Sequence, residues 1–160
     1  FLTIIKTHLI YKFILYNIKI NVSVMMKTPD QLISEAKSEI TEISVLELHE
    51  KYLKHPDIIL IDVREPEEHQ ACAIDRAVNF PRGMLEMKIA QHPVVNHYCE
   101  VERALADLAE KDIYLVCGTG GRSALATQSL QRMGFEKIFS VQGGMQAWLD
   151  AGLPTISISG

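Results

Sequence analysis

From residue 28 onward, short hydrophobic runs alternate with stretches in which apolar residues recur at helical spacing. Runs that are almost wholly apolar are typical of parallel strands covered on both faces. Four such runs predict strands, and each is bounded by Pro, Gly or charged residues. They are "DIILIDV" (57–63), "AVNFP" (77–81), "DIYLVCG" (112–118) and "KIFSVQG" (137–143).

The stretches between these runs carry helix start signals. Thr28 is an N-cap candidate, with Pro29 at the first helical position and Gln31 three residues after the cap, which predicts a leading helix over 28–39. Ser44 and Glu47 form a second capping box. Further helices are expected at 66–71, 100–110, 123–134 and 144–154. This alternation predicts an α/β fold with a mostly parallel central sheet and helices on both faces.

The first 24 residues differ in composition from the rest. They lack any acidic residue, and Lys6, Lys12 and Lys19 interrupt their apolar runs well short of the roughly 20 residues that span a bilayer. The bias is typical of AT-rich DNA read through upstream of a gene. We therefore expect residues 1–24 to be a non-native or unstructured extension, with translation starting at Met25 or Met26. A peripheral membrane anchor is the alternative.

Composition limits the class of protein. A chain of 160 residues with 48% hydrophobic and 22% charged residues is typical of one globular domain. A net charge of −4 gives no basic surface for nucleic acid, and no integral membrane span is expected. Cys72, Cys99 and Cys117 form neither a CxxC pair nor an even disulfide set. These features favour a reducing compartment and a cytoplasmic location.

Unusual polar residues follow three of the predicted strands, in "DVRE" (62–65), "NFPRG" (79–83) and "CGTGGRS" (117–123). Ligands of open α/β sheets bind beyond the carboxyl ends of the strands. The fold is therefore expected to bring five side chains to one rim: Asp62, Arg64, Arg82, Cys117 and Arg122.

The segment from Cys117 to Ser123 predicts an anion-binding cradle. Gly118, Gly120 and Gly121, with Thr119, let the backbone turn its N–H groups inward, and a helix begins near Ser123. A thiol at the centre of such a cradle is stabilised as the thiolate, and Arg122 adds a positive charge for an oxyanion. This indicates a nucleophilic cysteine. The alternative is an inert cysteine buried at a strand end.

The motif "CGTGGRS" resembles the active-site loop of the rhodanese family, C-x-x-G-x-R, with Cys117, Gly120 and Arg122 at the patterned positions. "LIDVREPEEH" and "VQGGMQAWLDAGLP" resemble that family's upstream and closing signatures. The resemblance covers residues 40–154 and implies a rhodanese-like domain.

The resemblance implies sulfur transfer. Cys117 would take the outer sulfur of thiosulfate or a similar donor, and the amides of Gly118 to Ser123 would hold the resulting persulfide. Cyanide or a thiol, including the thiol of a protein, would then accept the sulfur. Arg122 would orient the anionic donor, and no metal or organic cofactor is required.

Two alternative functions stay open. The first is a non-catalytic module that carries persulfide sulfur or binds a partner. The second is a cysteine phosphatase or arsenate reductase, which uses a similar cradle with one more residue between Cys and Arg. Four residues separate Cys117 from Arg122, which favours sulfur over phosphate. For Asp62 and Arg64 we prefer a bracing role to donor contact, and Arg82 is either a solvated charge or a second anion contact.

One segment departs from the family pattern. Where rhodanese-like chains read close to G-H-I-x-G-A, this chain reads "CAIDRA" (72–77). Arg76 thus replaces a glycine, which should strain the local backbone rather than impair catalysis. We do not expect Cys72 to be a resolving thiol. His49 and His69 are expected to be solvated. The segment "QHPVVNHYC" (91–99), with His92, His97 and Cys99, matches no standard zinc pattern and is expected to be a surface loop.

Overall fold

The structure is a computed structural model that describes residues 12, 26–55 and 57–158. The chain divides into two units, residues 1–32 and the compact unit 33–160 that carries the fold. The expectation for residues 1–24 lies outside the described residues, apart from Lys12. In the described part of the chain, no helix has the length and apolar character to cross a membrane.

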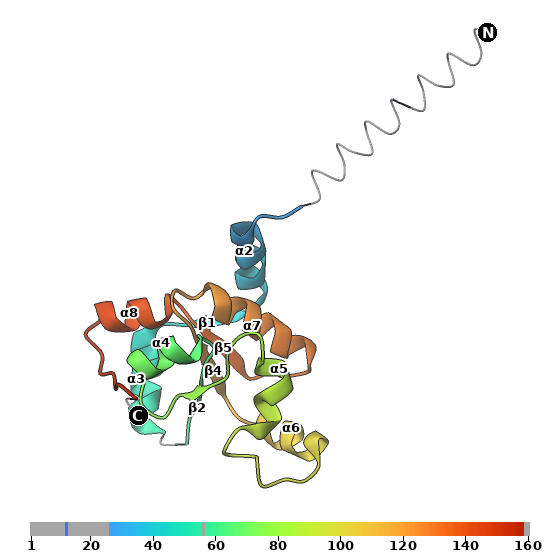
Figure 1. The fold of residues 1–160 in the computed structure, drawn as a ribbon, viewed down its shortest axis with the longest axis vertical. Helices are drawn as coiled ribbons and strands as arrows, with labels where there is room; N and C mark the ends of the chain where they lie inside the picture. Colours follow the sequence, from blue (N-terminus) through green and yellow to red (C-terminus); the bar gives the residue numbers. More distant parts are fainter. Residues whose placement is uncertain (1–11, 13–25, 56, 159–160) are drawn as a thin grey trace, which may run out of the picture. The chain divides into compact units, whose positions relative to one another are not determined.

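The centre of the fold is a five-stranded, all-parallel sheet with strand order β1-β5-β4-β2-β3. The strands are β1 (Thr41–Ile43), β2 (Ile59–Asp62), β3 (Val78–Asn79), β4 (Ile113–Val116) and β5 (Ile138–Val141) (Figure 1). The four predicted strands are present. The pattern missed β1, because three residues at the sheet edge, two of them polar, leave no hydrophobic run.

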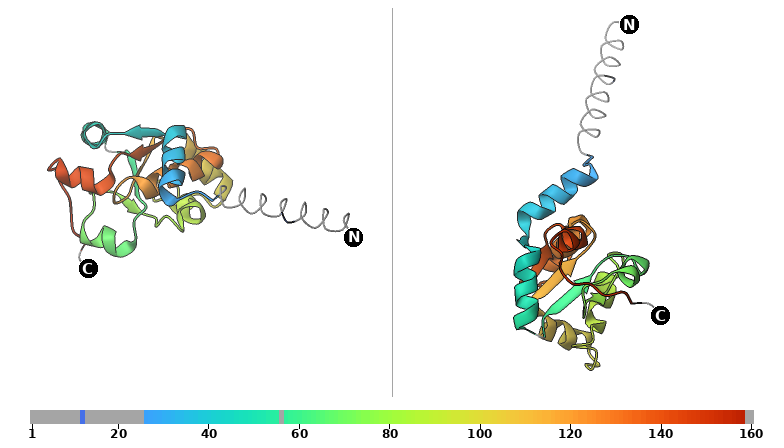
Figure 2. Two further views of the ribbon diagram at one scale, coloured as in Figure 1. Left: turned by 90° about the horizontal axis from the view of Figure 1, so that it is seen from above. Right: turned by 90° about the vertical axis from the view of Figure 1, so that its left-hand side faces the viewer.

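Helices cover both faces of the sheet, which confirms the predicted fold class (Figures 1 and 2). Residues of β2 and β4 alternate between two hydrophobic cores: Ile61 and Leu115 face one, Leu60 and Tyr114 the other. The first core contains residues from α5 (Leu85–Lys88), α6 (Val101–Ala109) and α7 (Gly121–Arg132). The second contains residues from α3 (Val45–Lys54) and α8 (Gly144–Asp150).

Both predicted capping boxes are present. At the start of α2 (Pro29–Glu39), the Thr28 amide donates to Gln31 Oε1 at 2.9 Å and the Gln31 amide to Thr28 Oγ1 at 3.3 Å. At α3, the Ser44 and Glu47 amides are satisfied in the same reciprocal way, at 3.1 and 3.2 Å. These caps satisfy amides that have no partner inside the helix.

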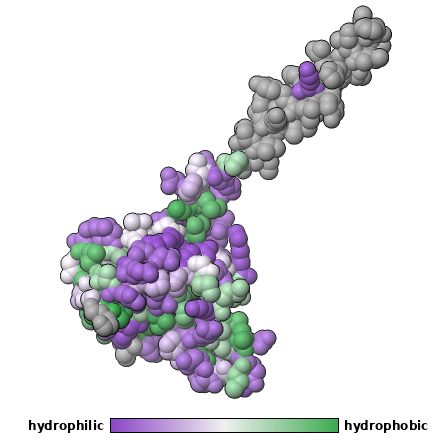
Figure 3. All heavy atoms as spheres, in the orientation of Figure 1, coloured by the Kyte–Doolittle hydropathy of each residue, from purple (hydrophilic) through white to green (hydrophobic). Residues whose placement is uncertain are grey.

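The segment between β3 and α6 contains helical turns that the hydrophobic pattern did not predict. It contains α5 and a 3₁₀ turn, Ile89–Gln91. Hydrophobic side chains are exposed around α5, α6 and the chain between them, and green spheres are visible at the lower right of Figure 3. The exposed side chains are Met84, Met87, Val94 and Val101.

Candidate active site

The candidate site lies at the carboxyl end of β4, which runs between β2 and β5. Asp62 at the end of β2 pairs in register with Val116 at the end of β4, and the Val63 amide donates to the Val116 carbonyl at 2.9 Å. Cys117 is the next residue. The polar residues that follow β2 therefore lie beside the cysteine loop, as the topology predicted.

The Cys117 thiol lies inside the loop and is 1% exposed. Its Sγ accepts a hydrogen bond from the Gly120 amide at 3.1 Å. Gly120 has φ +90°, a left-handed conformation that glycine adopts without strain, and α7 begins at the next residue, Gly121. A sulfur atom here faces both an inward-pointing amide and the N-terminus of a helix, an arrangement that favours negative charge.

Two buried hydroxyls lie behind the sulfur. The thiol donates to Ser123 Oγ at 3.5 Å, and Ser140 Oγ on β5 donates to the same Ser123 Oγ at 2.9 Å. Both serines are fully buried. When the thiol loses its proton, the Ser123 hydroxyl is left free to donate to the sulfur, because Ser140 already supplies a hydrogen to the serine oxygen.

The start of α8 holds the backbone of the cysteine loop. The Met145 amide donates to the Cys117 carbonyl at 2.7 Å, and the Gln146 amide donates to the Gly118 carbonyl at 3.0 Å. This approach is possible only because residue 144 is glycine. A Cβ there would lie 2.3 Å from the Cys117 oxygen, and φ is +59°.

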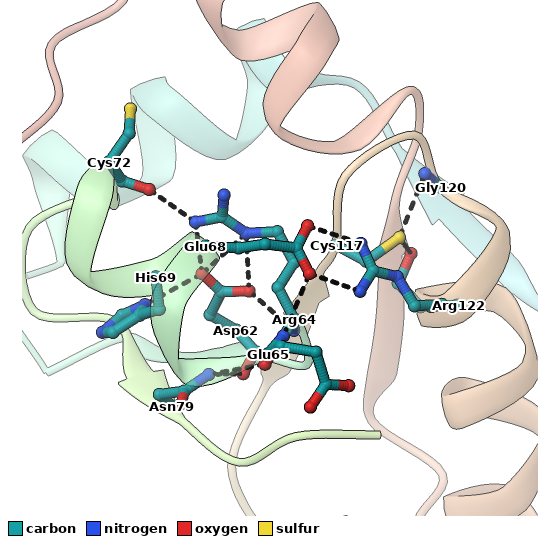
Figure 4. A network of polar contacts seen from close by, with 11 residues as sticks. Asp62, Arg64, Glu65, Glu68, His69, Cys72, Asn79, Cys117, Gly120 and Arg122 are labelled. Atoms are coloured by element: carbon teal, nitrogen blue, oxygen red, sulfur yellow. Dashed lines mark hydrogen bonds and ion pairs between the residues drawn. The ribbon is translucent and has the colours of Figure 1, made fainter. Parts of the chain in front are cut away.

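Asp62 is the centre of a buried polar network (Figure 4). Its carboxylate accepts from Arg64 Nη2 at 2.7 Å and lies 2.9 Å from His69 Nδ1. Arg64 also donates to the Cys72 carbonyl, and Asn79 Nδ2 donates to the backbone oxygens of Asp62 and Arg64. This is the geometry that a bracing role for Asp62 and Arg64 requires, because Nε and Nη2 of the guanidinium hold the Asp62 carboxylate and the Cys72 carbonyl together.

The expectation that His69 is solvated is wrong, and that for His49 is wrong in part. His69 is 7% exposed because α4 (Pro66–Ala71) turns its ring onto the Asp62 carboxylate. Its charged neighbours in the sequence, Glu67 and Glu68, suggested a solvated helix face and gave no sign of this contact. The His49 ring is half-buried and packs edge-on against Trp148, with ring centroids 5.5 Å apart.

Arg122 forms a two-pronged ion pair with Glu68 of α4. Nη1 and Nη2 donate to Oε2 and Oε1 at 2.7 and 2.8 Å, and both side chains are partly exposed (Figure 4). The hydrogen bonds from Arg122 lower the pKa of Glu68 to about 2, although partial burial acts the other way. Glu68 is one of the site residues that the sequence analysis missed. Its signal was a carboxylate in the first turn of the helix that follows β2.

Arg82 does not join the cysteine loop. Its Nη1 donates to Glu86 Oε1 at 3.1 Å, and the same oxygen accepts from Ser129 Oγ of α7. Opposing effects act on Glu86: burial raises its pKa, but the bonds from Ser129 and Arg82 outweigh burial and lower it. Arg82 is therefore a partly exposed charge with a local partner, so the recorded contacts give no support to a second anion contact.

The segment "CAIDRA" shows what its departure from the family pattern costs. Arg76, which replaces a glycine, has φ +65°. Among the residues that the structure describes, no other non-glycine residue has a positive φ. Its guanidinium lies 3.9 Å over the Tyr52 ring. The Cys72 sulfur points away from Cys117, which agrees with the expectation that it is not a resolving thiol (Figure 4).

Within the described residues, no group of three or more His, Cys, Asp or Glu side chains has a geometry that could hold a metal ion. The segment 91–99 is not wholly a surface loop, since His92 is 4% exposed and packs against Phe80 with ring centroids 6.2 Å apart. Burial lowers the pKa of His92. Cys99 is exposed and all three cysteines are free thiols.

Two relatives from Bacillus subtilis share this region. The chain is 32% identical over 110 residues to the putative sulfurtransferase YtwF, covering 69% of this chain and 91% of that protein. It is 33% identical over 116 residues to the putative sulfur carrier protein YrkF, covering 72% of this chain. The matched region spans only 54%, about half, of YrkF.

Among solved structures, the fold matches that of a Rhodopseudomonas palustris protein of unknown function described as a possible tyrosine phosphatase. The TM-score is 0.68 at 27% identity, covering 82% of this chain and 96% of that one. The model of the rhodanese-like domain family matches residues 44–151, which include Asp62, Glu68, Cys117, Arg122 and Gly144. Because this match extends over well more than half of the chain, the protein belongs to the rhodanese-like domain family.

Proposed function

We propose that this protein transfers sulfane sulfur through a persulfide on Cys117. One observation carries the proposal: Cys117 Sγ accepts the Gly120 amide at 3.1 Å, inside a glycine loop that leads directly into α7. Such a site stabilises a sulfur anion without a cofactor. The names of the two relatives, a putative sulfurtransferase and a putative sulfur carrier, support the same class of chemistry.

The reaction is written with thiosulfate as donor. The Cys117 thiolate attacks the outer sulfur, a new S–S bond forms, and the bond between the outer and central sulfur atoms breaks with its electron pair leaving on sulfite. The charge of −3 is conserved between the reactants and the products, a cysteine persulfide anion and sulfite. An acceptor thiol or cyanide then takes the terminal sulfur and regenerates the Cys117 thiolate, which makes a ping-pong cycle.

The proposal gives roles to the other residues. Gly120 and the amides of Gly118, Thr119, Gly121 and Ser123 are assigned to holding the persulfide, and Arg122 to contacting the anionic donor. Asp62 and Arg64 are assigned a bracing role. The free state of all three cysteines supports a reducing, cytoplasmic location.

Loop size favours sulfur over phosphate. Four residues separate Cys117 from Arg122, and the loop closes so tightly that the sulfur is almost fully buried. A tetrahedral phosphate needs a wider ring of amides. The description of one structural relative as a possible phosphatase makes p-nitrophenyl phosphate hydrolysis a necessary control.

The test is to incubate the purified protein with thiosulfate and map added sulfur by mass spectrometry of the peptides. We expect one added sulfur atom on Cys117 and none on Cys72 or Cys99, which act as internal controls. The Cys117→Ala variant should gain none. An absence of persulfide in the wild type, or phosphatase activity in its place, would refute the proposal.

A second measurement separates an enzyme from a carrier. Cyanide added to the persulfide form should release thiocyanate over many cycles when thiosulfate is in excess. Release of a single equivalent, with no further turnover, would favour the carrier alternative, to which the name of one relative points.

A further inference from the structure

We infer that Glu68 selects the sulfur donor: by holding Arg122, it disfavours doubly charged sulfonated donors such as thiosulfate relative to alkyl persulfides, which carry at most one negative charge. The inference rests on the proposed function, since it concerns the donor that loads Cys117. It makes Glu68 a specificity-determining residue rather than a catalytic one, because its carboxylate contacts Arg122.

The first step concerns the N–H groups with which Arg122 can bind an oxyanion. A guanidinium binds a planar or tetrahedral oxyanion best through two parallel N–H groups. In Arg122 the pair on Nη1 and Nη2 is already bound to both oxygens of Glu68, at 2.7 and 2.8 Å. A sulfonate oxyanion must therefore displace the Glu68 carboxylate or bind to the remaining N–H groups of the guanidinium.

The second step concerns charge. Glu68 is ionised at neutral pH, since Arg122 lowers its pKa to about 2, so it cancels the charge of Arg122. Glu65 is close enough to Arg122 to act on it as a further negative charge. Lys37, which lies near Gly120, pairs with Glu42 at 3.3 Å. The recorded groups around the loop thus leave no net positive charge to attract a dianion.

The third step places this pair at the entrance to the sulfur. A Cβ added to Gly118, the residue after Cys117, would lie 3.1 Å from Arg122 Nη2 and 4.0 Å from Glu68 Oε1. Both charged groups therefore border the cysteine loop itself. A donor that approaches Cys117 along this side of the loop meets the carboxylate as well as the guanidinium.

The two donors place different demands on this entrance. Thiosulfate arrives with two negative charges and leaves as sulfite, which also carries two. An alkyl persulfide anion, R–S–S⁻, carries one. When its protonated form R–S–S–H meets the Cys117 thiolate, the outer sulfur transfers, the old S–S bond breaks, and the alkyl thiolate leaves with the electron pair. Cancelling the charge of Arg122 therefore costs the thiosulfate reaction more.

The experiment compares Glu68→Gln with Glu67→Gln. Both variants remove one carboxylate from α4, but Glu67 is exposed and has no recorded bond to Arg122. The measured quantity is the second-order rate constant for loading Cys117, by mass spectrometry, with thiosulfate and with 2-hydroxyethyl persulfide. We expect Glu68→Gln to raise the thiosulfate-to-persulfide ratio about fivefold, the size of one partly exposed charge interaction. Glu67→Gln should leave this ratio unchanged.

Each other outcome has a distinct meaning. An unchanged ratio in Glu68→Gln, or an equal rise in Glu67→Gln, would overturn the role of Glu68 while Cys117 still loads, which leaves the proposed function intact. A faster rate of loading with thiosulfate in Glu68→Gln than in the wild type cannot come from misfolding, so it supports the inference even if the variant is less stable. Failure of both donors to load Cys117 in the wild type would overturn the proposed function itself.

Discussion

Gly144 offers the sharpest test of how the scaffold shapes the cysteine loop. Its φ is +59°, and a Cβ at this position would lie 2.3 Å from the Cys117 oxygen and 2.8 Å from the carbonyl carbon and oxygen of Gly118. All three are backbone atoms, so no flexible side chain can move aside. We expect Gly144→Ala to displace the Cys117–Gly118 peptide or the start of α8, or both.

The magnitude follows from comparison with Gly152, at the end of α8. Gly152 has φ +66°, but nothing lies within 4 Å of an added Cβ. Gly152→Ala therefore incurs only the cost of the left-handed conformation, about 1 kcal/mol in the free energy of unfolding. Gly144→Ala incurs that cost and a steric one of about 1–3 kcal/mol, since the packed backbone resists overfilling. The total remains below the stability of a typical domain, about 5–15 kcal/mol.

Urea unfolding of both variants measures the loss of stability. The rate at which Cys117 is loaded with sulfur measures the displacement of the cysteine loop. Gly144→Ala should be less stable than Gly152→Ala and should load at least about tenfold more slowly, because small displacements of a reacting group cost rate steeply. Gly152→Ala should load as the wild type does. If the two variants prove equal in stability and in rate, the close approach of α8 does not position the cysteine.

Three further predictions follow from single contacts. Ser140→Ala removes the hydroxyl that orients Ser123, and we expect it to slow loading of the thiol about fivefold, measured in a single turnover. Arg76→Ala should lower the free energy of unfolding by about 1 kcal/mol, because the contact with the Tyr52 ring is lost. Arg76→Gly loses the same contact but also relieves the positive φ, so its free energy of unfolding, measured in urea like that of Arg76→Ala, should stay near that of the wild type. Because the pKa of Glu68 is lowered from 4.5 to about 2, its carboxylate stabilises the fold at pH values above 4.5, and this contribution is lost as the pH falls toward 2. The difference in the free energy of unfolding between the wild type and Glu68→Gln should therefore be constant from pH 7 to 5 and smaller at pH 3.

The buried parts of the fold could be predicted because each leaves a local trace. Strands β2 and β4 are four buried residues each, and such runs stand out in the sequence. Ser44 and Glu47 mark the start of α3 by a reciprocal bond that is local in the chain. Strand β1 leaves no such trace, because pairing with β5 defines it and its residues are mostly exposed or half-exposed.

The cysteine loop could be predicted for the same reason, but the residues of other segments that contact it could not. Cys117, Gly120 and Arg122 lie within six residues, and their spacing alone indicates an anion cradle. The partner of Arg122 is 54 residues away in the sequence, at Glu68. Ser140 likewise has no signal in the strand that carries it. Contacts between distant segments need the sheet topology before they can be assigned.

The position of β4 between β2 and β5 explains why three separated motifs form one site. The loop after β5 leads into α8, whose amides bind the carbonyls of Cys117 and Gly118 and so fix the shape of the loop. The loop after β2 leads into α4, whose Glu68 fixes the position and the charge of Arg122. Shape and charge thus come from opposite sides of β4. A substitution at Gly144 should therefore change the rate with every donor, whereas one at Glu68 should change the order of preference among donors.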